Sequence, residues 1–220
     1  MNIEEKLTAF AMLGAGWVMW LLVLLSVIGL AIVLERAYVL WSSRDNLSSL
    51  RQRLRTLLEK RDLDGAQSLL KDAKSFEARV VMAGLKAHTK GAAAVEERIA
   101  SESTLAKLAM ERNLAFLGTV GNNAPFVGLL GTVIGIIRAF HELDQSEGQV
   151  TSGLMAEVGE ALVATAIGLL VALPAVAFFN LFNRLIRARL AQGEALGREL
   201  LSFLKSTPFS DEVPSAEPAE

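Results

Sequence analysis

One stretch near the end of the sequence constrains the fold of this chain more than any other. Residues 161–182 are apolar with three exceptions, Thr165, Pro174 and Asn180. A helix of this length crosses a bilayer core of about 30 Å, so we predict a transmembrane helix over residues 158–183. Glu160 stands near its beginning. A carboxylate within a bilayer costs roughly 2.5–3.5 kcal/mol on insertion scales and points to ion or proton movement. Position alone also allows Glu160 to lie at the membrane edge, in reach of water.

Two further apolar runs predict that the chain crosses the membrane three times. Residues 16–34 contain no charged residue and predict the first transmembrane helix, and residues 114–137 predict the second. Four aromatic residues with a polar edge flank the first run and mark the two membrane interfaces: Trp17, Trp20, Tyr38 and Trp41. The predicted fold class is therefore an all-α membrane protein.

The second apolar run is suited to contact with other helices rather than with lipid. Small residues let helices approach closely, and both this run and the third are rich in them: Gly128, Gly131, Gly135 and Gly168. Pro125 and Pro174 each remove a backbone hydrogen bond and predict a bend in their helix. The amides of Asn122 and Asn123 need a protein or a wet cavity to face. We expect the second and third helices to line an oligomeric core.

The charges are segregated along the chain, which is 52% hydrophobic and 21% charged. Residues 35–112 hold 15 Lys and Arg, whereas none follows Arg138 before the third apolar run. Because basic loops stay in the cytoplasm, this asymmetry predicts the orientation. The predicted order is a periplasmic N-terminus (1–15), a cytoplasmic helical domain (35–113), a short periplasmic loop (138–157), a cytoplasmic helix (184–206) and a disordered tail (207–220).

Within the cytoplasmic domain, the spacing of apolar residues predicts four amphipathic helices. Leucines recur at helical spacing in the first, at Leu47, Leu50, Leu54, Leu57 and Leu58. The predicted helices cover residues 46–60, 66–74 and 76–88, and a fourth begins near 92. We expect the fourth to run without interruption into the second transmembrane helix.

The composition argues against several classes of function. The chain has no cysteine and only two histidines, so a protein metal site is not expected. Phosphate-binding and nucleophile-elbow motifs are missing from the sequence, so we expect neither a nucleotide cofactor nor an enzyme. The net charge of −2 gives no basic field for nucleic acid.

The polar residues of the two later helices fall at similar predicted depths. Thr132 lies six residues inside Arg138, and Thr165 lies five residues inside Glu160, so both hydroxyls are roughly 8–9 Å below the outer edge. Together with the carboxylate they predict a polar ring. Glu160 and Thr165 are about 140° apart around their helix and therefore face different neighbours.

Three blocks of the sequence resemble one family. Residues 124–136, APFVGLLGTVIGI, and 159–180, GEALVATAIGLLVALPAVAFFN, look like the two signature segments of the ExbB/TolQ/MotA proton-channel family. Residues 18–40 are similar to the first membrane helix of its ExbB and TolQ branch, including the pair Glu35 and Arg36. The blocks occur in the family's order and cover about 80 residues.

The resemblance implies a homopentamer in the bacterial inner membrane, whose second and third helices surround a dimeric, single-transmembrane partner of the ExbD/TolR/MotB type. Such proteins use the proton-motive force to drive work at the outer membrane or cell surface, through a TonB-like or TolA-like protein or in gliding. By motif match, Glu160 is the family's functional glutamate, Thr165 and Thr132 are its threonines, and Pro125 and Pro174 are its helix-bending prolines.

The chain also departs from the family pattern. Ala156 and Glu157 replace a Pro-Gly pair, which adds a second acid beside Arg138 at the predicted pore mouth. Asn122 and Asn123 replace small or hydroxyl residues. These departures leave open the subfamily and the choice between protons and sodium. A structural scaffold, in which Glu160 merely pairs with Arg138, is the alternative function.

Overall fold

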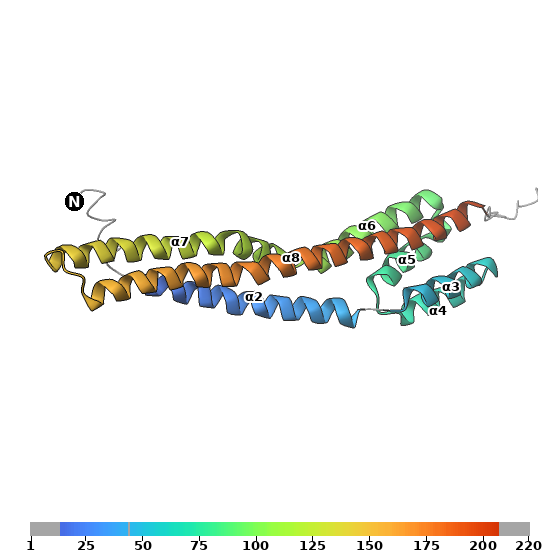
Figure 1. Ribbon diagram of the computed structural model, residues 1–220. Helices are drawn as coiled ribbons and strands as arrows, with labels where there is room; N and C mark the ends of the chain where they lie inside the picture. The colour runs from blue at the N-terminus through green and yellow to red at the C-terminus, as the bar shows by residue number, and fades with distance from the viewer. Residues whose placement is uncertain (1–13, 44, 207–220) are drawn as a thin grey trace, which may run out of the picture. The chain divides into compact units, whose positions relative to one another are not determined.

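The computed structural model describes residues 14–43 and 45–206, and in that part of the chain it is helical without a β-strand (Figure 1). The predictions of a periplasmic N-terminus for residues 1–13 and of a disordered tail for residues 207–220 lie outside the described residues. The helices are α2 (Gly16–Ser42), α3 (Leu47–Glu59), α4 (Leu63–Asp72), α5 (Phe76–Lys86), η1 (His88–Lys90), α6 (Ala92–Glu111), α7 (Leu114–Gln145) and α8 (Ser152–Ser206).

The chain divides into two compact units, which we describe separately. The membrane unit comprises Met1–Ala37 and Glu111–Arg184, and the polar unit comprises Tyr38–Met110 and Leu185–Glu220. Three of the described helices, α2, α7 and α8, contain segments long and apolar enough to cross a membrane. The predicted fold class, an all-α protein with three such helices, is confirmed.

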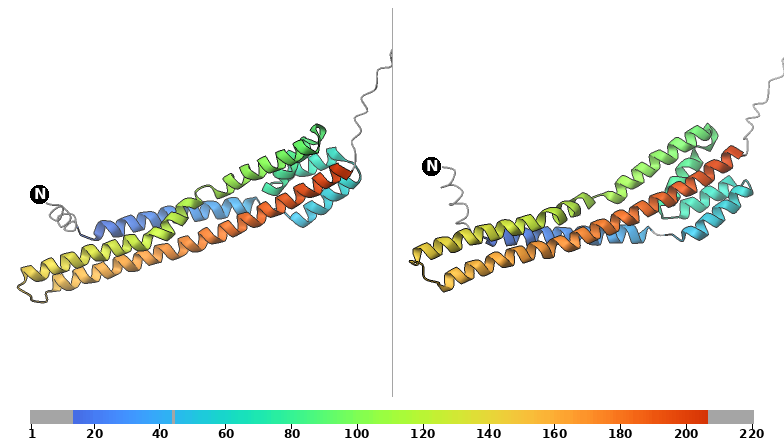
Figure 2. Two further views of the ribbon diagram at one scale, coloured as in Figure 1. Left: turned by 90° about the horizontal axis from the view of Figure 1, so that it is seen from above. Right: turned by 45° about the horizontal axis from the view of Figure 1, so that its top comes forward.

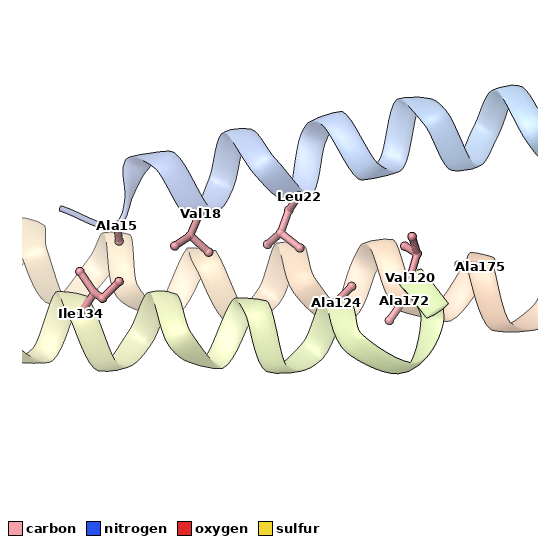
Figure 3. Packing of buried hydrophobic residues seen from close by; sticks show 8 residues of the cluster. All are labelled: Ala15, Val18, Leu22, Val120, Ala124, Ile134, Ala172 and Ala175. Carbon is pink, nitrogen blue, oxygen red and sulfur yellow. The ribbon is translucent and has the colours of Figure 1, made fainter. Parts of the chain in front are cut away.

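In the membrane unit, α7 and the first part of α8 run side by side, and α2 packs against them (Figure 2). The core consists of small and medium side chains drawn from all three helices (Figure 3): Ala15, Val18, Leu22, Val120, Ala124, Ile134, Ala172 and Ala175. Large apolar side chains point outward, as Trp20, Phe126 and Leu170 show with exposures of 76%, 69% and 71%. A surface this apolar is expected where the surrounding solvent is lipid.

The polar unit is built like a water-soluble helical domain. One face of α3 buries Leu50, Leu54 and Leu58, while its arginines remain exposed. Side chains cap the starts of three helices by accepting a backbone N–H: Asn46 on α3, Asp62 on α4 and Ser75 on α5. These caps set where α3, α4 and α5 begin. Each of the three helices begins within three residues of its predicted start.

The connection between α7 and α8 is shorter than the predicted loop over 138–157. Helix α7 continues to Gln145 and α8 begins at Ser152, so only residues 146–151 are non-helical. The sequence offers nothing to end α7 earlier, whereas Glu147 and Gly148 turn the backbone left-handed at φ 51° and 83°. The backbone N–H of Leu154 donates to Thr151 Oγ1 at 3.1 Å, which fixes the start of α8.

The predicted continuous helix through α6 and α7 is wrong. Helix α6 ends at Glu111, and Asn113 adopts the left-handed conformation with φ 63° before α7 begins at Leu114. Asparagine tolerates this conformation better than most residues because its short polar side chain bonds locally. Here Asn113 Nδ2 donates to Glu35 Oε2 at 3.3 Å. By contrast, the prediction that the third long helix continues to Lys205 is confirmed, since α8 reaches Ser206.

Candidate functional site

The carboxylate of Glu160 lies at the beginning of α2. Glu160 is half-buried on α8, and its Oε1 atom is 3.8 Å from the place that a Cβ atom on Gly16 would occupy. Gly16 is the first residue of α2. Backbone N–H groups at a helix start carry partial positive charge and favour a nearby carboxylate. The structure therefore places the Glu160 carboxylate close to the first residue of α2.

An ion pair joins α7 to α8 at the same end of the membrane unit. Arg138 Nη2 lies 2.7 Å from Glu157 Oε1, and the two side chains are 31% and 19% exposed. The other carboxylate oxygen of Glu157 is buried without a hydrogen-bond partner. Arg138 thus pairs with Glu157, and the pairing with Glu160 that the scaffold alternative expects is not the one observed.

The segment that leads into α2 packs against this ion pair. Gly14 has φ 84°, and a Cβ atom at this position would collide with Arg138 Nη1. The left-handed backbone conformation favours glycine here, and the guanidinium of Arg138 packs against it. The sequence did not single out Gly14 or Gly16, because a glycine before an apolar run is also an ordinary helix boundary.

The two threonines bind backbone carbonyls instead of lying free. Thr165 Oγ1 donates to the Gly128 carbonyl of α7 at 3.2 Å, and Thr132 Oγ1 donates to the Leu129 carbonyl of its own helix at 2.6 Å. Both side chains are half-buried. Thr165 therefore contacts α7, while the Glu160 carboxylate lies near the start of α2. The structure does not bring Glu160 and Thr165 together.

The glycines of the sequence pattern bring the backbones of α7 and α8 into contact. A Cβ atom on Gly168 would lie 2.7 Å from the Ala124 carbonyl oxygen and 3.0 Å from Gly128 Cα. Cβ atoms on Gly131 and Gly135 would lie 2.6 and 2.5 Å from the Cβ atoms of Ala164 and Ala161. These small residues pack α7 against α8 within this chain, and their place around a pore stays a prediction.

The asparagines and prolines lie on the same two helices. Asn122 and Asn123 are exposed, and Asn123 Nδ2 donates to the Thr119 carbonyl at 2.8 Å. Pro125 and Pro174 each lie inside a helix that continues past them, α7 and α8 respectively. The amides are therefore available to a neighbouring molecule.

A second acid–base pair, not anticipated from the sequence, lies in the polar unit. Glu77 is buried near the start of α5, and its carboxylate oxygens have no hydrogen-bond partner in the side chains around it. Arg189 Nε of α8 is 3.9 Å from Glu77 Oε1. Burial raises the pKa of Glu77, and nearby Asp45 raises it further, against the lowering effects of its own backbone N–H and Arg189. In sequence, Glu77 looks like an ordinary acid in the first turn of a helix.

Arg189 also binds the end of α2 within the polar unit. Its Nη2 donates to the Leu40 carbonyl at 2.7 Å, and its Nη1 donates to Ser43 Oγ at 2.9 Å. The Leu40 carbonyl is one of the acceptors that the last turn of a helix leaves unsatisfied. No group of three or more metal-ligating side chains occurs among residues 14–43 and 45–206.

The sequence is similar to a known family and to several named proteins over part of its length. Residues 72–195 match the MotA/TolQ/ExbB proton channel family. The biopolymer transport protein ExbB-like 2 of Helicobacter pylori is 45% identical over 78 residues, which are 36% of this chain and 52% of that protein. The biopolymer transport protein ExbB of Aquifex aeolicus is 38% identical over 106 residues, 48% of this chain and 71% of the relative.

A relative from the Tol branch matches as well. The Tol-Pal system protein TolQ of Pseudomonas aeruginosa is 45% identical over 74 residues, 34% of this chain and 32% of that protein. The chain spans about half the length of several curated ExbB-type relatives that it matches. Since the family match covers residues 72–195, more than half of the 220 residues, the chain belongs to the MotA/TolQ/ExbB proton channel family.

Proposed function

We propose that this protein is the proton-conducting subunit of an energy-coupling motor in the bacterial inner membrane. The observation that carries the proposal is the placement of Glu160: an acid at the start of a membrane-length helix, half-buried against another such helix. Carboxylates in this setting are costly and mark ion pathways. The family that residues 72–195 match is described as a proton channel family, which supports the proposal.

In this proposal Glu160 takes up and releases the transported proton. Exchange occurs with an aspartate on a dimeric, single-transmembrane partner of the ExbD/TolR/MotB type, enclosed by a pentamer of this chain. Thr132 and Thr165 line the path beside it. Moving one charge through 100 mV yields about 2.3 kcal/mol, so a few protons per step suffice to turn one part against the other.

The orientation and the driven machine belong to the same proposal. The 15 basic residues of 35–112 support a cytoplasmic polar unit, with the α7–α8 connection and the N-terminus in the periplasm. Similarity to biopolymer transport proteins favours work on a TonB-like arm, and similarity to a Tol-Pal protein supports a TolA-like arm as the second candidate. A gliding machine and a sodium-driven variant are the remaining candidates from the sequence.

The experiment is proton flux into vesicles that hold this protein together with its single-transmembrane partner, followed with a trapped pH-sensitive dye. We expect flux only when both proteins are present and its loss in Glu160→Gln. Asp144→Asn is the matched control, because Asp144 is an exposed acid near the end of α7 and should leave flux unchanged. Full flux in Glu160→Gln contradicts the proposal. A flux of sodium instead of protons in the same vesicles identifies the sodium-driven variant.

A further inference from the structure

Near the start of α2, one basic side chain, Arg138, faces two acidic side chains of α8. Arg138 is the only Lys or Arg between residues 113 and 183 of the sequence, whereas two acids of α8, Glu157 and Glu160, lie one helical turn apart. Side chains three residues apart share one face of a helix. A single guanidinium therefore has two candidate carboxylates on the same face.

The structure places both carboxylates around one short segment. Arg138, held by Glu157 at 2.7 Å, contacts Gly14, and the carboxylate of Glu160 adjoins Gly16. Two residues of extended chain span at most about 7 Å. The guanidinium and the Glu160 carboxylate thus border the same three-residue segment, 14–16, and Glu160 lies on the same face of α8 as the carboxylate that binds Arg138.

We propose that Glu157 is a positioning residue that keeps Arg138 away from Glu160. The inference rests on the proposed function, in which Glu160 must gain and lose a proton. An arginine in contact with a carboxylate favours its charged form and opposes protonation. By binding the guanidinium, Glu157 leaves the Glu160 carboxylate free of a fixed counter-charge.

The details of the ion pair fit a positioning role better than a stabilising one. Partly exposed ion pairs contribute little to stability on average. Glu157 also has one buried oxygen without a hydrogen-bond partner, which is unfavourable. The pair nevertheless fixes the direction of the guanidinium, because Arg138 is bound by Glu157 on one side and packed on Gly14 on the other.

The test is a pair of variants in vesicles that also hold the partner. Glu157→Gln releases Arg138, and we expect proton flux to fall at least tenfold. Adding Arg138→Gln removes the released charge, and we expect flux to return to within threefold of the wild type. Glu157→Asp keeps a carboxylate and should retain flux. If the pair is merely structural, the double variant, which lacks it entirely, stays as impaired as the single variant.

A second measurement separates this inference from the proposed function. Hydrophobic carbodiimides react with protonated carboxyl groups, and mass spectrometry locates the modified residue. We expect labelling of Glu160 to fall at least threefold in Glu157→Gln and to recover in the double variant, whether or not the vesicles conduct protons. Equal labelling in the wild type and Glu157→Gln overturns the positioning role. If Glu160 labelling falls in Glu157→Gln and recovers in the double variant, but the wild type conducts no protons, the positioning role stands and only the proposed function is contradicted.

Discussion

Two arginine–glutamate pairs, one from each unit of this protein, differ in distance, burial and surroundings. In the membrane unit, Arg138 and Glu157 are in direct contact at 2.7 Å and partly exposed, with a further acid, Glu160, one turn away. In the polar unit, Arg189 and Glu77 are buried and 3.9 Å apart. The first pair thus has a second carboxylate beside it on the same helix, whereas the second pair joins α5 to α8.

The two units also differ in the side chains that pack their helices together. Glycines and alanines bring α7 and α8 into backbone contact, as expected where lipid provides no hydrophobic force between helices. The polar unit instead buries leucine side chains, such as Leu54 at 2% exposure and Leu200 at 0%, and exposes its charges. Stability should therefore depend on close backbone approach in one unit and on burial of side chains in the other.

The largest effect that we predict is in the polar unit. Arg189→Met removes the cation beside Glu77 and the donor to the Leu40 carbonyl, leaving both groups buried. Breaking a buried pair in this way costs about 3–5 kcal/mol of unfolding free energy. Thermal unfolding of the purified protein in detergent, followed by circular dichroism, measures the loss. Arg187→Met is the matched control, since Arg187 is exposed two residues earlier on α8. Equal stability of the two variants contradicts the structural role of Arg189.

A smaller loss is expected in the membrane unit. Gly168→Ala places a methyl group 2.7 Å from the Ala124 carbonyl oxygen, which forces α7 and α8 apart. Overpacking of this kind costs about 1–3 kcal/mol. Gly159→Ala on the same helix meets no atom within 4 Å and should be neutral or slightly stabilising. Unfolding temperatures of the two variants test the difference, and a Gly168→Ala protein as stable as Gly159→Ala refutes the close contact.

The smallest effect concerns pH. Because burial raises the pKa of Glu77, the folded protein binds this proton more tightly than the unfolded chain does. The resulting stability is fully present below the ordinary glutamate pKa of about 4.3 and is lost as pH rises through the raised pKa of the folded state. Glu77→Gln removes this contribution, so we expect its unfolding temperature to decline less with rising pH than that of the wild type. Parallel curves contradict the raised pKa.

Much of the fold was predictable because its signals are local. Apolar length identified the three long helices, and the spacing of apolar residues identified those of the polar unit. The ends of α6 and α7 were not predictable, since they depend on the left-handed conformations of Asn113 and Glu147. The sequence around each residue has a helical pattern that does not predict a left-handed conformation.

The residues of the candidate site could be predicted from the sequence, but the acid with which Arg138 pairs could not. Motif resemblance identified Glu160, Thr165 and Thr132, and their roles stay predictions. Which acid Arg138 binds depends on the rotation of α8 against α7, and this is set by backbone contacts far along the helices, at Gly128 and Gly168. Glu77 escaped notice because its burial arises from Arg189, 112 positions away in the sequence.

The most direct test of this account compares the acids of the two units in one experiment. Proton flux and unfolding temperature are measured for Glu160→Gln and Glu77→Gln, each reconstituted with the single-transmembrane partner. We predict that Glu160→Gln abolishes flux and leaves the unfolding temperature unchanged, whereas Glu77→Gln conducts like the wild type and changes the stability and its pH dependence. Flux that survives in Glu160→Gln, or is lost equally in both variants, contradicts the assignment of proton movement to Glu160.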